Sequence, residues 1–155
     1  MPFRITGLSG NPFEHLFGLP DDALSRQNAK RYVADTKPGF PCRITLEDAE
    51  PGETLLLVPY AHQTSQTAYA SKGPIFIREH STSRHVCRNE IPEQLRARLI
   101  SLRAYDETGM MLDADVVDGK HLKPLIERFL ANEDVSYLHA HFARRGCYAA
   151  LVERA

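Results

Sequence analysis

The chain has 155 residues, and its 19 basic and 20 acidic residues leave a formal net charge of -1. This balance gives no field that would steer the protein to nucleic acid or to an anionic membrane, so we expect neither partner. A chain of this length can bury one core, and we expect a single α+β domain over residues 1–155.

Two further classes are disfavoured by the sequence. No apolar run approaches the ~20 residues that a membrane-spanning helix needs, and no basic start precedes an apolar segment, so we expect a cytoplasmic protein. The three cysteines, Cys42, Cys87 and Cys147, are widely spaced and lack a CxxC pattern. They indicate neither a disulfide framework nor a zinc ribbon.

The first part of the chain predicts short elements. Residues 3–6 alternate as a strand does. Residues 11–18 predict a helix that begins with Asn and Pro and ends at a glycine. Residues 20–24 predict the start of a second helix, with acidic residues at the N-terminal, positive end of the helix dipole. Residues 31–34 predict a strand, after which two prolines and a glycine force a loop at 37–43.

The middle of the chain predicts two strands separated by a polar loop. Residues 54–60 contain the buried run LLLV, and Pro59 indicates that this strand ends or lies at a sheet edge there. Residues 61–72 are polar and predict an exposed loop, and 73–79 predict the next strand. The polar stretch 80–89 predicts a surface connection or a lid.

A short helix is predicted from Pro92 to about Arg98, and a hairpin follows it. Residues 99–106 and 110–117 form its strands, with Gly109 in the left-handed position of the turn. The register that sorts both strands into an apolar and a polar face pairs Arg103 with Asp113, Ser101 with Asp115 and Tyr105 with Met111.

The region of about 120–131 predicts the one longer amphipathic helix, which covers the sheet. Its apolar positions at i, i+3, i+4, i+7 and i+8 are Leu122, Leu125, Ile126, Phe129 and Leu130. Hairpins with a few short helices favour an α+β fold with a largely antiparallel sheet.

The last hairpin, YLHAHFARRGCYAA, gathers most of the reactive side chains. His139 and His141 alternate with apolar residues and therefore project from one face. Gly146 supplies the turn, and a two-residue loop is favoured, which sets His141 opposite Ala150. A three-residue loop would set Cys147 opposite Ala143, so the register decides whether Cys147 or Tyr148 joins the histidine face.

Five segments carry a family resemblance over nearly the whole chain: KPGFPCR with LEDAEPGE, GPIFIRE, RAYDETGMMLDADVVDG and YLHAHFARRGCYAA. Together they resemble the bacterial family catalogued as domain of unknown function 1203. The resemblance implies a single-domain bacterial protein but no activity, cofactor or catalytic residue. The family pattern that it implies includes Cys42, Arg43, His139, Arg144, Arg145, Gly146, Cys147 and Tyr148.

The residues support several hypotheses about chemistry. One is a polar acid–base or hydrolytic site on a sheet face, built from His139, His141, Arg103, Asp113, Asp115 and Tyr148. The alternative is that these residues only form cross-strand ion pairs on a solvent-exposed face of the sheet. Two histidines at i, i+2 could also bind a metal with a neighbouring carboxylate, but no third ligand is fixed, so we assign neither metal nor cofactor.

Three other readings remain open. Cys147, beside Arg144 and Arg145, could act as a nucleophile with His141 as base, or pair with Cys42, although a buried structural cysteine is the simpler interpretation. The arginine pair and the Gly146 amides, with Arg43, could bind an anion, or form a solvated hairpin tip. The histidine face could instead be the interface of a non-catalytic homodimer.

We therefore expect a small anionic ligand, a phosphate, nucleotide or carboxylate, at this hairpin, with hydrolase or acid–base activity as an option. The catalytic candidates are His139, His141 and Cys147. The candidates for ligand binding are Arg43, Arg103, Arg144, Arg145, Gly146, Tyr148, Asp113 and Asp115.

Overall fold

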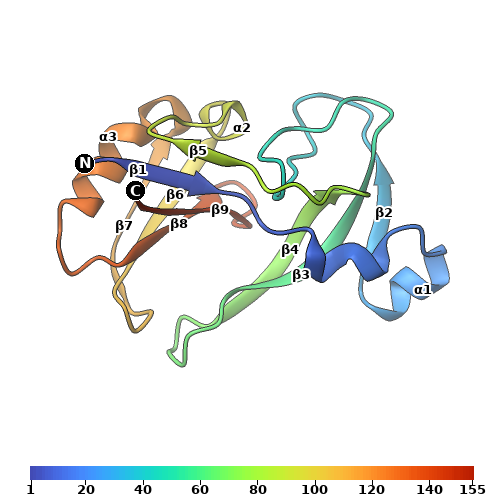
Figure 1. The fold of residues 1–155 in the computed structure, drawn as a ribbon, viewed down its shortest axis with the longest axis horizontal. Helices are drawn as coiled ribbons and strands as arrows, with labels where there is room; N and C mark the ends of the chain where they lie inside the picture. Colours follow the sequence, from blue (N-terminus) through green and yellow to red (C-terminus); the bar gives the residue numbers. More distant parts are fainter.

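The computed structural model describes residues 1–155 and contains two antiparallel sheets (Figure 1). The larger sheet has the strand order β5-β1-β9-β8-β6-β7, and the smaller has β2-β3-β4. The strands are β1 (Phe3–Thr6), β2 (Lys30–Val33), β3 (Thr54–Gln63), β4 (Ser71–Arg78), β5 (Val86–Arg88), β6 (Leu99–Tyr105), β7 (Met111–Asp118), β8 (Tyr137–Phe142) and β9 (Tyr148–Arg154). The helices are η1 (Asn11–Leu16), α1 (Asp21–Arg26), α2 (Glu93–Arg96), η2 (Gly119–His121) and α3 (Leu122–Leu130). The predicted α+β class is confirmed.

Helix α3 covers one face of the larger sheet, away from the smaller sheet in Figure 1. All five of its predicted core side chains are buried, and they pack with Leu102, Leu138 and Ala140 of the sheet. Burial of each large apolar side chain contributes about 1.5–3 kcal/mol, so this helix is held by packing. None of the helices is both long enough and apolar enough to cross a membrane.

A second core lies between the smaller sheet and the N-terminal helical segments. It includes Leu56 and Val58 of β3, Ile75 and Ile77 of β4, and Tyr148 of β9. Because Tyr148 belongs to the larger sheet but packs in the core of the smaller one, it joins the two sheets.

Strand β3 extends beyond its predicted end. Strand β2 pairs only with Thr54 to Leu57, so β3 has no neighbour on that side from Val58 onward. Pro59 lacks a backbone N–H and is tolerated there, which agrees with the predicted edge position. The prediction of a loop over 61–72 is wrong for Ala61–Gln63, which lie in β3, and for Ser71 and Lys72, which lie in β4.

The stretch 80–89, predicted as a connection, contains the short strand β5. It pairs with β1 through Thr6 and Val86, Ile5 and Cys87, and Arg4 and Arg88. Its polar composition suits a short strand at the edge of a sheet.

The hairpin of β6 and β7 departs from the predicted register. Gly109 is left-handed with φ 89° and Tyr105 pairs with Met111, both as predicted. Leu112 is then an extra residue, so Asp113 pairs with Ala104 and Asp115 with Leu102. The predicted pairs with Arg103 and Ser101 are wrong, because a bulge shifts all following residues to the opposite face.

The hairpin of β8 and β9 also differs from prediction. Gly146 has φ 80° and its N–H bonds the Phe142 carbonyl, so residues 143–146 form a longer loop than the favoured two-residue turn. Ala140 pairs with Ala150, as the three-residue alternative requires, and a bulge then pairs His141 with Tyr148. Tyr148, not Cys147, therefore joins the histidine face.

Candidate functional site

Three histidines from both sheets meet on the face of β8 that is opposite α3. His139 and His141 project together from β8 as predicted, and His62 reaches them from the end of β3. The ring centroid of His62 lies 4.9 Å from that of His141 and 6.1 Å from that of His139. One ring nitrogen of each lies within 4.8 Å of the others. We call these residues the histidine cluster.

Tyrosine rings surround the histidine cluster. Tyr148 stacks on His62 with ring centroids 5.7 Å apart, and Tyr105 and Tyr137 lie 5.1 and 5.2 Å from His139. As a result His139 is 5% exposed and His141 is fully buried. His62 is only partly buried, so the solvent side of the cluster is at His62.

Burial keeps the three imidazoles neutral at pH 7. Removal from water is the largest cause and neighbouring positive charges, including Arg103, add to it, so that the pKa of His139 falls to about 3 and that of His141 to about 4. The pKa of His62 is also lowered, first by burial and then by Arg103. Neutral imidazole is the form that serves as a base or a metal ligand.

The hydrogen bond at His141 fixes its tautomer. Its Nδ1 lies 2.9 Å from the Gly146 carbonyl oxygen, and because a carbonyl can only accept, Nδ1 carries the proton. Nε2 then bears a lone pair, and this atom is buried without a partner. Nδ1 of His62 and Nδ1 of His139 are likewise buried without partners.

Arg103 gives the site a positive charge. It lies on β6 directly opposite His139, and its Nε is 3.4 Å from the Ser101 hydroxyl. It takes part in none of the ion pairs of the chain. Arg84 is also near, because its charge acts on the pKa values of Tyr60 and Tyr148, which burial raises. No carboxylate is among the groups that shift the pKa values of the histidines.

The two aspartates predicted for this face lie on the other one. Through the bulge, Asp113 and Asp115 share the face of Ala104 and Leu102, and both are exposed. Each accepts a hydrogen bond from the next backbone N–H, and Asp115 also pairs with Arg128 of α3 at 3.4 Å. The structure therefore does not bring them to the histidines.

The hairpin tip is separate from the histidine cluster. Arg144 and Arg145 are exposed, and their side chains form no hydrogen bond or ion pair within the chain. Of the tip residues, Gly146 contacts the cluster, through the carbonyl that accepts from His141.

Arg43 ties the hairpin to the rest of the fold. It is 2% exposed, and it donates to the carbonyls of Tyr148 and Pro41 and to Cys147 Sγ, at 2.8, 2.6 and 3.2 Å. Burial lowers its pKa to about 10, so it remains charged at neutral pH. Cys42 is buried and accepts from the Arg78 N–H, and Cys42 and Cys147 are both free thiols.

Sequence reasoning missed His62, because it was assigned to a loop. Strand alternation extended past Pro59 would place His62 on the face of Leu56, Val58 and Tyr60, and the structure has a register shift between Tyr60 and Gln63. Extending the strand would have put His62 on an apolar face, although its meeting with β8 depends on how the two sheets pack.

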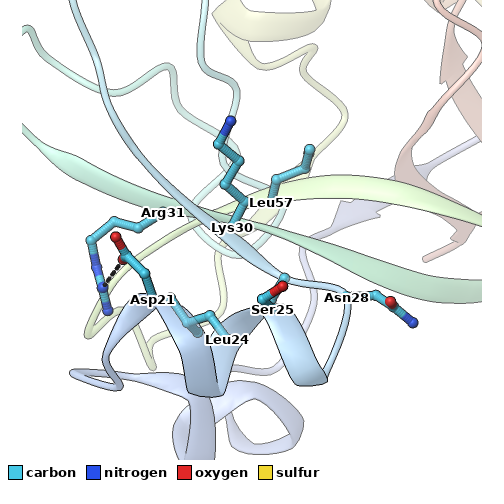
Figure 2. A pocket seen from close by; sticks show the side chains of 8 residues that line it. Asp21, Leu24, Ser25, Asn28, Lys30, Arg31 and Leu57 are labelled. Carbon is cyan, nitrogen blue, oxygen red and sulfur yellow. Dashed lines mark hydrogen bonds and ion pairs between the residues drawn. The ribbon is translucent and has the colours of Figure 1, made fainter.

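Two surface grooves lie elsewhere. Figure 2 shows one of about 500 Å³ between α1 and β2, where Arg31 is already paired with Asp21 and Glu79. A second, of about 610 Å³, includes Arg154, which donates to three backbone carbonyls. Neither groove contains a predicted site residue, and the arginine in each is already bound within the fold.

The fold and the site define an α+β protein with a buried, carboxylate-free histidine cluster between two antiparallel sheets. Comparison with known families adds the assignment: residues 39–154 match the family described as Protein of unknown function (DUF1203). The match covers most of the chain, so the protein belongs to this family, as the sequence resemblance indicated. No curated protein and no solved structure matches the chain.

Proposed function

We propose that the protein binds a small anionic ligand, a phosphate, nucleotide or carboxylate, beside Arg103 at the solvent side of the histidine cluster. The observation that carries this proposal is a partly exposed guanidinium without an acidic partner. Other partly buried arginines, such as Arg31 and Arg98, are paired with Glu79 and Asp48. A free arginine next to neutral rings is suited to charge-assisted hydrogen bonding of an anion.

This location differs from the hairpin tip that the sequence favoured. Arg144 and Arg145 are exposed, and at exposed positions an ion pair contributes at most about 1 kcal/mol. Arg103 lies beside buried aromatic and imidazole rings, where the lower effective dielectric strengthens each charged contact. Arg103 is therefore the stronger candidate for the anion.

If the protein is an enzyme, we propose hydrolase or acid–base activity on the anion bound at this site. Imidazoles whose pKa values are about 3 and 4 are uncharged at neutral pH, so they are poor general acids, and they are also weak bases. Catalysis at this site therefore requires a further group that activates water. Three free thiols suit a reducing compartment, so we retain the cytoplasm as the proposed location.

Thermal shift in phosphate-free buffer tests the ligand proposal. Inorganic phosphate, acetate, citrate and AMP are added to the wild type, Arg103→Gln, Arg145→Gln and the remote control Arg26→Gln. Saturation at 100 Kd stabilises by about 2.7 kcal/mol, which raises the Tm by roughly 5–10 °C. We expect Arg103→Gln to weaken binding about 10- to 100-fold, because it removes a charged hydrogen bond.

The controls decide the location. Binding that survives Arg103→Gln and is lost in Arg145→Gln would transfer the site to the hairpin tip. A wild type whose Tm is unchanged by all four anions would contradict the ligand proposal.

The alternative function is a non-catalytic homodimeric interaction module. A partner chain cannot contact the buried His139 and His141 directly, but β6 and the edge strand β7 carry exposed apolar side chains at Leu99, Leu112 and Val116. Sedimentation equilibrium of the wild type and of Leu112→Glu with Val116→Lys tests this alternative. A dimer that the double variant dissociates would support it, and a monomer at all concentrations would remove it.

A further inference from the structure

We propose that His62, His139 and His141 together bind one divalent transition-metal ion of the zinc and cobalt class. Three imidazoles are a common protein ligand set for zinc, with metal–nitrogen bonds of about 2.0–2.1 Å. Around a tetrahedral ion such nitrogens lie about 3.3 Å apart. The observed separations, up to 4.8 Å, would close by small side-chain rotations.

The lone pair of His141 is the first argument. Its Nδ1–H donates to the Gly146 carbonyl, so Nε2 cannot donate a hydrogen bond to an anion. A buried acceptor needs a donor or a cation, and the chain supplies no donor to this atom. A carbonyl that holds the second nitrogen of a ligating histidine is the usual support of a metal site.

The second argument is the concentration of unpaired atoms. Apart from Arg78 Nε, which forms an ion pair with Glu53 Oε2 at 3.0 Å, four buried side-chain nitrogen or oxygen atoms lack a hydrogen-bond partner: His62 Nδ1, Gln94 Oε1, His139 Nδ1 and His141 Nε2. Three of them belong to the histidine cluster. An unsatisfied buried polar atom costs about 1–3 kcal/mol, and one metal ion bound by the three rings would recover much of this cost.

The burial of the rings is the third argument. His139 is 5% exposed and His141 is fully buried, and no acidic partner of either ring is present among the ion pairs or hydrogen bonds of the chain. A charged imidazolium is disfavoured at such positions, and the neutral ring is the form that binds a metal.

The ligand set also indicates the kind of metal. Three nitrogens without a carboxylate suit zinc, cobalt, nickel or copper, whereas magnesium and calcium prefer oxygen ligands. Tyr105, Tyr137 and Tyr148 keep water from most of the site. Three protein ligands leave one coordination position free, which is the arrangement of catalytic zinc sites.

The free position gives the anion a second attachment, and this step rests on the proposed function. The bound ion and Arg103 would both carry positive charge, and no carboxylate is among the groups that shift the pKa values of the three histidines. A small oxyanion would bind the metal through one oxygen and Arg103 through another. Without an anion, a water molecule at this position would become more acidic, which supplies the group that hydrolysis requires.

A cobalt titration tests the metal site. Untagged protein is stripped with chelator, dialysed and titrated with Co²⁺ in phosphate-free buffer at pH 7.5, and visible absorption and bound metal are measured. We expect one Co²⁺ per chain and the intense visible bands of a four-coordinate site. Zn²⁺ should displace the Co²⁺ and abolish the bands.

Variants identify the ligands. His62→Gln is preferred because His62 is partly exposed and its replacement leaves the core intact, and His121→Gln is the matched control on an exposed residue. We expect Co²⁺ binding to weaken at least 100-fold in His62→Gln and to remain unchanged in His121→Gln. His139→Gln is compared only if its circular dichroism matches the wild type. Tight Co²⁺ binding that survives His62→Gln, or no stoichiometric binding by the wild type, would overturn the metal site.

Inorganic phosphate and acetate separate this inference from the proposed function. Bands that form with Co²⁺ and shift with either anion support both. Co²⁺ bands that form but do not shift with phosphate or acetate, together with an unchanged Tm, would support the metal site and contradict the anion site. Anion binding by a protein that takes up no Co²⁺ would support the anion site and contradict the metal site.

Discussion

At the scale of single residues, the arginines that are paired with a carboxylate stabilise the fold, whereas an arginine without an acidic partner is available to a ligand. Arg31 donates two hydrogen bonds to Glu79, and Arg98 donates two to Asp48. Arg103 has no such partner. Sequence alone identified Arg103 and the two β8 histidines, but it could not tell a paired arginine from a free one, because the partners are 48 and 50 residues away.

The Arg31–Glu79 pair predicts a pH-dependent stability. Hydrogen bonds from Arg31 lower the pKa of Glu79 to about 2, from an ordinary value of 4.5. The lowered pKa means that this contribution is complete above about pH 4.5 and is lost as the pH falls towards 2. We expect Glu79→Gln to reduce the free energy of unfolding by about 2 kcal/mol at pH 7, and by progressively less between pH 4.5 and 2.

Urea denaturation across this pH range measures the effect. Glu93→Gln is the control, because Glu93 is 77% exposed and pairs only with Arg96 within its own helix. We expect less than about 0.5 kcal/mol from the control. A Glu79→Gln deficit that is the same at pH 7 and pH 2.5 would refute the assignment to the ionised carboxylate.

At the scale of elements, the sequence predicted the periodic segments and failed where periodicity breaks. Helix α3 agrees with its predicted apolar positions, because a nine-residue amphipathic pattern is unambiguous. The bulges at Leu112 and Ala149 each add one residue to a strand, and alternation gives no sign of them. One bulge moved Asp113 and Asp115 away from the site, and the other brought Tyr148 to it.

The contact between α2 and η2 predicts a sensitive glycine. A Cβ on Gly119 would lie 1.8 Å from the Leu95 carbonyl oxygen, a backbone atom that cannot rotate away. We expect Gly119→Ala to destabilise the protein by about 1–3 kcal/mol or more, because α2 must move. Gly73→Ala is the matched control, since nothing lies within 4 Å of its Cβ position. Equal melting temperatures of the two variants would contradict the close contact.

At the scale of the whole molecule, the site exists only because two sheets meet. His62 comes from the smaller sheet, and the other two histidines and Arg103 come from the larger one (Figure 1). The tips of the two hairpins also touch, where Thr67 Oγ1 donates to the Gly109 carbonyl at 3.3 Å. Sheet packing of this kind involves contacts distant in sequence, which is why no local pattern pointed to His62 as the third histidine.

A ligand shared by both sheets should stabilise the entire fold. We expect Zn²⁺ at 1,000 Kd to add about 4 kcal/mol and to raise the Tm by roughly 8–16 °C in a single transition. His62→Gln should lose this increase while His121→Gln retains it. Calorimetry with and without Zn²⁺ measures it, and an equal increase in His62→Gln would assign the effect to another site.

Zinc K-edge X-ray absorption of the protein loaded with one equivalent of Zn²⁺ tests the central claim most directly. The histidine cluster predicts three imidazole nitrogens and one further oxygen or nitrogen, all at about 2.0–2.1 Å. A sulfur shell at about 2.3 Å would instead place the ion at a cysteine, and oxygen ligands without imidazole scattering would place it on the surface. Either spectrum would contradict a metal centre formed by His62, His139 and His141.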